Sequence, residues 1–108
     1  MRYNKLVRDK IPKIIKENNQ LPKTHTANQK EYEQKLKDKL REEVEEFLED
    51  SNEEELADIL EVIYAICDLY EFDISEIDKI RKNKADKRGA FKQKIILDEV
   101  TESSQKTY

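Results

Sequence analysis

Two short acidic runs contain the residues of this chain best suited to chemistry. The first is Glu42-Glu43-Val44-Glu45-Glu46, and after a gap of eight residues the second is Glu55-Leu56-Ala57-Asp58. Residues three apart share one face of a helix, so each run can present a pair of carboxylates. Two such faces turned toward each other would surround a hard divalent cation with oxygen ligands. Because no His or Cys accompanies them, we expect Mg²⁺, with Mn²⁺ as the alternative, rather than zinc.

The position of Glu43 distinguishes these runs from ordinary charged surface. The chain holds 25 acidic residues in 108, so an acidic run can arise by chance on a solvated helix. However, Glu43 falls inside the apolar stripe of its helix, and Glu46 falls at its edge, whereas Glu45 and Glu49 face away. That stripe consists of Tyr32, Leu36, Leu40, Val44, Phe47 and Leu48. A carboxylate on an inward face is costly unless it is paired or binds a metal.

Helix-start signals and apolar periodicity predict the elements that position these residues. We expect four helices, over residues 9–18, 26–49, 51–71 and 73–87, capped by Asp9, Thr26, Ser51 and Asp73 in turn. The connection at 50–52 is short, so the second and third helices should run antiparallel and bring both acidic runs together. The predicted ligands are Glu43, Glu46, Glu55 and Asp58, and the candidate general bases are Glu42 and Glu43.

The predicted fold class is all-α, an antiparallel bundle of about four helices. One Gly and two Pro leave little turn chemistry for a many-stranded fold. Gly89 should end the last helix, and residues 91–100 should be extended or weakly ordered. We expect one domain over residues 1–100 and a polar, disordered tail over 101–108.

Composition narrows the class of protein. The charged fraction is 43% but mixed in sign, with net charge −4, which disfavours nucleic acid as a partner. The single cysteine, Cys67, lies in the most apolar stretch and is expected to be a buried structural thiol. No apolar run has the length of a membrane span, so we expect a soluble cytoplasmic protein. The helix over 51–71 is apolar on two sides, which predicts a homodimer or higher homo-oligomer.

Basic residues near the acidic runs suit a phosphorylated substrate. Mg²⁺ bound by carboxylates usually also binds substrate phosphates. Lys5 and Arg8 lie in the basic opening, Lys39 precedes the first acidic run, and further lysines crowd residues 79–88. We expect these clusters to bind phosphate.

Three blocks of the chain together resemble a known family. KLREEVEEF followed by EELADILEVI resembles the MazG-like all-α nucleoside triphosphate pyrophosphohydrolase superfamily, whose signature is EExxE followed by ExxD. The opening YNKLVRDKIP and the late RGAFKQKIIL resemble a subgroup labelled phosphoribosyl-ATP pyrophosphohydrolase-like. The blocks fall within residues 2–97, almost the whole chain.

The resemblance implies an oligomeric all-α enzyme that uses Mg²⁺ to cleave a nucleotide between its α and β phosphates. Residues at the matching motif positions are Glu42, Glu43, Glu46, Glu55 and Asp58. Lys5 and Arg8 fall in the opening block, and relatives place phosphate- and sugar-contacting groups in the late segment that holds Asn83, Lys84, Lys87 and Arg88. The eight-residue gap between the motifs is short for the superfamily, which leaves the substrate open.

Three alternatives to this function remain. The first is phosphoribosyl-ATP pyrophosphohydrolase activity proper. The second is a catalytically silent helical module whose acidic faces bind a partner through salt bridges. The third is a nucleic-acid binder that uses residues 79–88, which the acidic balance disfavours. The base, the sugar and the number of metal ions stay open.

Overall fold

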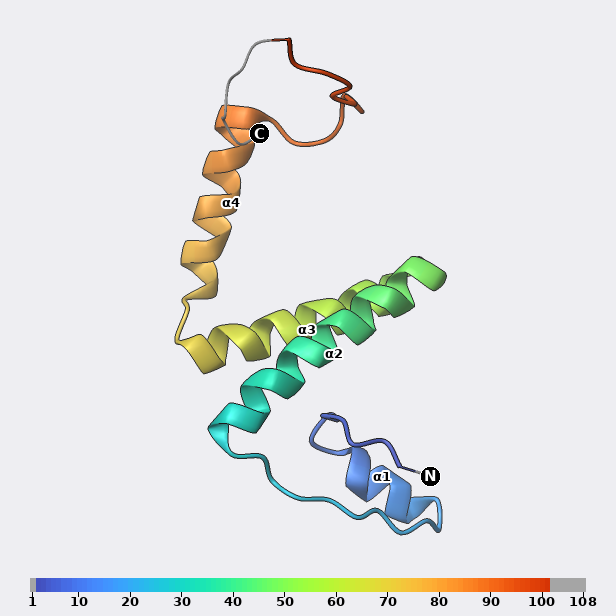
Figure 1. The fold of residues 1–108 in the computed structure, drawn as a ribbon. Helices are drawn as coiled ribbons and strands as arrows, with labels where there is room; N and C mark the ends of the chain where they lie inside the picture. Colours follow the sequence, from blue (N-terminus) through green and yellow to red (C-terminus); the bar gives the residue numbers. More distant parts are fainter. Residues whose placement is uncertain (1, 102–108) are drawn as a thin grey trace. The chain divides into compact units, whose positions relative to one another are not determined.

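The computed structural model describes residues 2–101 and shows an all-helical fold (Figure 1). The elements are α1 (Ile11–Glu17), α2 (Gln29–Glu49), α3 (Glu53–Tyr70) and α4 (Ile74–Arg88). No strand occurs within the described range, so the predicted all-α class with four helices is confirmed. The described residues group into two compact units, 2–74 and 75–101. The predicted polar tail, apart from Thr101, lies outside the described residues.

Asparagine side chains begin the two long helices. The Asn28 side chain accepts a hydrogen bond from the Glu31 N–H at 2.9 Å, and the Asn52 side chain accepts one from the Glu55 N–H at 3.0 Å. The predicted caps at Thr26 and Ser51 are therefore wrong by two residues and one residue. Asn caps a helix as well as Ser or Thr does. The helix begins after the residue whose side-chain oxygen can accept from the backbone N–H groups of the first turn.

The predicted cap of α1 is also wrong. Lys10 occupies the N-cap position and makes no side-chain capping bond, so Asp9 does not begin this helix. Pro12 in the first turn fits the helix start, because its missing N–H would have no partner there in any case.

The α2 and α3 helices pack side by side as an antiparallel hairpin (Figure 1), as the short connection predicts. Their buried apolar residues are Leu36 from α2 and Val62 and Cys67 from α3. Burial of the Cys67 thiol is confirmed. This pair of helices is the scaffold that positions the acidic runs.

Part of the predicted core is exposed. Leu48 is 71% exposed and Val44 is 37% exposed, so their assignment to the core of α2 is wrong for this chain by itself. On α3, Leu56, Leu60 and Tyr64 are about half exposed, while Val62 is buried. The physical reason is that α3 has two apolar faces, and Val62 lies one helical turn after Asp58, whose carboxylate meets that of Glu43 on α2.

The second unit holds most of α4 and the segment after it. Gly89 directly follows α4 with φ +87°, a conformation that glycine adopts without steric cost, which confirms the predicted helix end. A turn follows, in which the Lys94 N–H donates to the Phe91 carbonyl at 3.2 Å. The remainder up to residue 101 forms no helix or strand. No helix within residues 2–101 combines the length and apolarity needed to cross a bilayer.

Candidate metal centre

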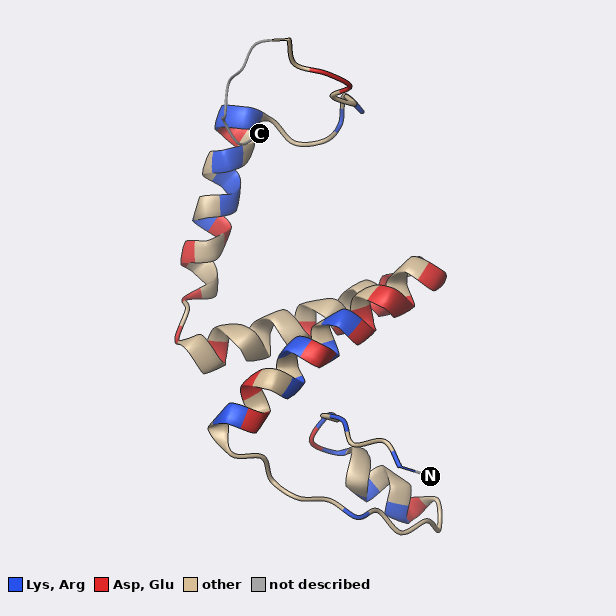
Figure 2. Ribbon diagram, in the orientation of Figure 1, with Lys and Arg blue, Asp and Glu red and all other residues tan. Residues whose placement is uncertain are grey.

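Three of the four predicted ligands converge between α2 and α3. Glu43 from α2 and Glu55 and Asp58 from α3 each place one carboxylate oxygen so that the three atoms lie within 4.8 Å of one another. Figure 2 shows the acidic positions gathering toward the end where α2 leads into α3. The antiparallel hairpin creates this cluster because it sets the last turns of α2 against the first turns of α3.

Glu43 is the buried member of the cluster. It is 6% exposed and is the one fully buried polar residue among those described. Lys39 Nζ lies 3.3 Å from Glu43 Oε1, but Glu43 Oε2 is buried without a hydrogen-bond partner. Burial raises the pKa of the Glu43 carboxyl, and the negative charges of Glu46 and Asp58 add to this effect against the opposing influence of Lys39. The negative charge of Glu43 is therefore only partly compensated by Lys39.

The negative charge of Glu55 is also only partly compensated. Its Oε2 is also buried without a partner. Burial is again the largest cause of the raised pKa of Glu55, followed by the negative charges of Glu46, Asp58 and Glu43. Because the Glu55 N–H is bonded to the Asn52 cap, the first turn of α3 positions this carboxylate.

The donor set fits a small hard cation. Mg²⁺ binds oxygen at about 2.1 Å, so ligands on opposite sides of the ion are about 4.2 Å apart. Oxygen atoms within 4.8 Å of one another reach that spacing by small side-chain rotations. Two buried oxygens without partners supply an independent reason for a cation here, since buried polar atoms are normally satisfied.

Glu46 and Glu42 lie beside the cluster rather than in it. Glu46 is exposed, and although its charge raises the pKa of Glu43 and Glu55, it is outside the group of three. Glu42 is engaged by two lysines, with Lys5 Nζ at 2.9 Å from Oε1 and Lys39 Nζ at 3.5 Å from Oε2. The hydrogen bond from Lys5 is the main cause of the lowered pKa of Glu42.

The basic opening lies against this acidic region. An Arg8 guanidinium nitrogen donates to Asp58 Oδ1 at 2.8 Å, and the other terminal nitrogen is 3.8 Å from Glu61 Oε2. Lys35 Nζ donates to the Asn4 carbonyl at 2.7 Å. The structure thus brings Lys5, Arg8 and Lys39 to the acidic region. Sequence reasoning missed Glu61 and Lys35, although Glu61 is one helical turn after Asp58 and shares its face.

The late substrate-binding candidates belong to the second unit. Asn83, Lys84, Lys87 and Arg88 lie in the second half of α4, where Figure 2 shows basic positions dominating. Ion pairs in the first half of α4 join Lys79 to Glu76 and Arg81 to Asp78 within the helix itself. A role of the four late residues at the carboxylate cluster stays a prediction.

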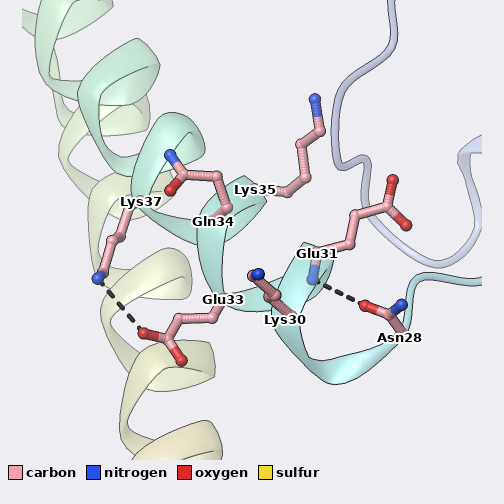
Figure 3. Close-up of a pocket in the computed structure, with 7 residues that line it drawn as sticks. All are labelled: Asn28, Lys30, Glu31, Glu33, Gln34, Lys35 and Lys37. Atoms are coloured by element: carbon pink, nitrogen blue, oxygen red, sulfur yellow. Dashed lines mark hydrogen bonds and ion pairs between the residues drawn. The ribbon is translucent and has the colours of Figure 1, made fainter.

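A hollow of about 540 Å³ lies at the start of α2, and Figure 3 shows the side chains that line it. Glu43, Glu55 and Asp58 are not among them. Two of its acids already have partners, because Glu33 pairs with Lys37 at 3.4 Å and Glu31 pairs with His25 at 3.0 Å. The lining residues are Asn28, Lys30, Glu31, Glu33, Gln34, Lys35 and Lys37. This hollow is formed by one helix and its cap, and it offers no set of free carboxylates.

A smaller pocket of about 40 Å³ lies between the basic opening and α2. It adjoins the carboxylate cluster, because Glu42, which precedes Glu43, lines it together with Lys5, Lys35 and Lys39. Its volume suits one or two water molecules.

Comparison with family models, curated protein sequences and solved structures finds no match to this chain.

Proposed function

We propose that this protein is a Mg²⁺-dependent nucleotide pyrophosphohydrolase that cleaves a nucleoside triphosphate or related nucleotide between its α and β phosphates. The observation that carries the proposal is the buried Glu43, whose Oε2 has no partner although it belongs to a cluster of three carboxylates. A bound cation would satisfy these oxygens, and an all-oxygen donor set favours Mg²⁺ or Mn²⁺.

The residues that would hold the cation are Glu43, Glu55 and Asp58. Glu46 is the candidate for a fourth ligand, because its charge acts on both Glu43 and Glu55. When bound, the ion would neutralise phosphate charge and activate water for in-line attack on phosphorus. A nucleotide bound at the cluster would place its phosphates next to cationic side chains, and Lys5, Arg8 and Lys39 lie there.

The environments of Glu42 and Glu43 favour different roles. Lys5 and Lys39 hold Glu42 ionised and lower its pKa, which makes it a weak proton acceptor. Burial raises the pKa of the Glu43 carboxyl in the metal-free protein, so of the two candidates Glu43 is the one that a lysine does not hold in its ionised form, and it keeps both of its predicted roles, as metal ligand and as general base. Lys39, within 3.5 Å of both carboxylates, is positioned to turn toward a phosphate oxygen.

The cleavage position comes from the family resemblance rather than from the geometry. The blocks KLREEVEEF and EELADILEVI place the cluster residues at the positions of the MazG-like signature. A cluster of this kind by itself suits any phosphoryl or nucleotidyl hydrolysis. The chemistry of the products therefore has to be measured.

We also propose that the protein forms a homodimer or higher homo-oligomer. Leu56, Leu60 and Tyr64 recur every four residues along one face of α3, and each is about half exposed. On α2, Leu48 is 71% exposed and Val44 is 37% exposed. A second copy of the hairpin would cover such stripes, since two identical amphipathic surfaces complement each other about a two-fold axis.

The direct test is hydrolysis of a panel of nucleoside triphosphates with Mg²⁺, followed by ³¹P NMR. We expect a nucleoside monophosphate and pyrophosphate. Glu43→Gln should lower kcat by at least about 10²-fold, because it removes a metal ligand as well as the candidate general base. The matched control is Glu45→Gln, which removes an exposed carboxylate from the same helix and should leave kcat unchanged.

The other outcomes decide between the alternatives. Diphosphate and phosphate as products would refute the cleavage position while keeping the metal site. A substrate restricted to phosphoribosyl-ATP would favour the biosynthetic activity. No product from any nucleotide would favour the silent interaction module.

A further inference from the structure

The residues of the basic opening bind the same acidic groups that would bind the metal. Residues 4–8, which we call the basic strap, are attached to α2 and α3 at three points. Asn4 accepts a hydrogen bond from Lys35, Lys5 pairs with Glu42, and Arg8 pairs with Asp58. The last contact engages Oδ1 of a predicted metal ligand at 2.8 Å.

The strap contacts offset part of the repulsion among the carboxylates of the acidic region. Two unit negative charges about 4 Å apart repel by about 1 kcal/mol in water and about 4 kcal/mol at an effective dielectric constant of 20. Three carboxylates within 4.8 Å, with Glu42, Glu46 and Glu61 near them, therefore need compensating positive charge. Arg8 supplies part of it, because its fork reaches both Asp58 and Glu61.

The strap compensates the negative charge of the cluster only in part, and its ion pair with Asp58 can exchange for another cation. Glu43 and Glu55 each keep a buried oxygen without a partner even with the strap in place. The Arg8 and Asp58 side chains are 55% and 39% exposed, so their ion pair is weak and easily exchanged. A divalent cation would supply twice the charge of Arg8 and reach all three carboxylates at once.

We propose that the basic strap is an internal counter-cation that occupies the metal site's Asp58 until a divalent cation displaces Arg8. The strap thereby compensates part of the negative charge of the metal-free cluster and raises the concentration of free metal needed to occupy it. Once displaced, Arg8 is free to bind an anionic group beside the ion. This inference rests on the proposed metal site but concerns its regulation, and it does not depend on which nucleotide bond is cleaved.

The test is Mn²⁺ binding without nucleotide, measured by isothermal titration calorimetry at low ionic strength. Arg8→Ala should bind Mn²⁺ about two- to fivefold more tightly than the wild type, which corresponds to the release of one exposed ion-pair network. Arg8→Lys should lie between the two, because an ammonium group keeps the charge but cannot fork to both carboxylates. Added salt should shrink the difference by screening the exposed pair.

The matched control is Lys13→Ala, which removes one positive charge from exposed α1, where Lys13 makes no ion pair within the described part of the chain. We expect wild-type affinity for this variant. A second readout is the Arg8 side-chain ¹⁵N resonance, which should shift during a Mg²⁺ titration with the dissociation constant of the metal itself.

Two results would overturn the strap, and a third would overturn the site. Equal or weaker Mn²⁺ binding by Arg8→Ala would show that Arg8 does not compete with the cation. An Arg8 resonance unaffected by saturating Mg²⁺ would show that the strap is not displaced. If wild-type protein and Glu43→Gln both fail to bind Mn²⁺, the metal site itself is refuted and the strap loses its role with it.

Discussion

Replacing Glu43 with Gln should stabilise the metal-free protein while abolishing its response to metal. In the folded state the carboxylate is 6% exposed, and its Oε2 has no partner. A buried acceptor without a partner costs about 1–3 kcal/mol, and more when it is charged. The substitution removes the buried charge, and an amide N–H in the place of Oε2 can donate to a neighbouring carboxylate, but the interaction with Lys39, whose Nζ lies 3.3 Å from Oε1, becomes weaker.

The balance of these effects sets the expected magnitude. Lys39 retains its contact with Glu42, and the amide oxygen of the variant can still accept from the Lys39 ammonium, so the loss at this contact should be about 1 kcal/mol, that of one ordinary hydrogen bond. The net gain should be about 1 kcal/mol in the free energy of unfolding at pH 7. For a chain of this size, that raises Tm by about 4–8 °C.

The gain in the free energy of unfolding that we expect from Glu43→Gln depends on pH. Burial raises the pKa of folded Glu43 above the ordinary value of 4.5. Stability linked to this group is therefore fully present below pH 4.5 and is lost as the pH rises through the folded pKa. Because the Gln variant does not titrate, its advantage over the wild type should be largest at neutral pH and should vanish toward pH 4.5.

Thermal unfolding followed by circular dichroism between pH 4 and 8 in EDTA measures this difference. Glu45→Gln is again the control and should change the free energy by less than about 0.5 kcal/mol. With saturating Mg²⁺ the order should invert, because binding stabilises only the folded wild type. Two results would refute this reasoning. One is a Glu43→Gln variant that is less stable than the wild type at pH 7 in EDTA. The other is a difference in stability in favour of the variant that grows as the pH falls.

Two further predictions concern the hairpin that carries the site. Asn52→Ala should lower the free energy of unfolding by about 1 kcal/mol, since the Glu55 N–H loses its 3.0 Å bond to the cap, and urea denaturation would measure the loss. Restoration by Asn52→Asp would confirm a capping role, whereas failure of Asp to restore stability would contradict it. Leu60→Glu, at a position 50% exposed, should convert an oligomer to monomers without loss of helicity, as seen by sedimentation equilibrium and circular dichroism. A wild type that sediments as a monomer at high concentration would refute the oligomer.

Much of the candidate site followed from local rules. The 3.6-residue period placed Glu43 among the apolar residues of α2, and it is buried there. The short connection after residue 49 predicted an antiparallel hairpin, and α2 and α3 do pack together. These properties are local because helix periodicity and loop length depend on neighbouring residues alone.

The tertiary structure decided which surfaces meet. Since α3 is apolar on two sides, its sequence cannot say which side packs on α2, and the structure buries Val62 and exposes Leu60. Likewise the spacing of Glu46 matched that of a ligand, yet only Glu43, Glu55 and Asp58 converge. The packing angle and register of two helices depend on all the side chains at their contact.

The acidic runs by themselves thus indicated a metal site through the types, spacing and inward direction of their carboxylates. Only the tertiary structure showed that their counter-charge comes from the opening of the chain. Lys5 reaches Glu42 across 37 positions of sequence, and Arg8 reaches Asp58 across 50. No periodicity links residues so far apart, because a contact of that kind forms only when the hairpin has folded and the strap lies across it.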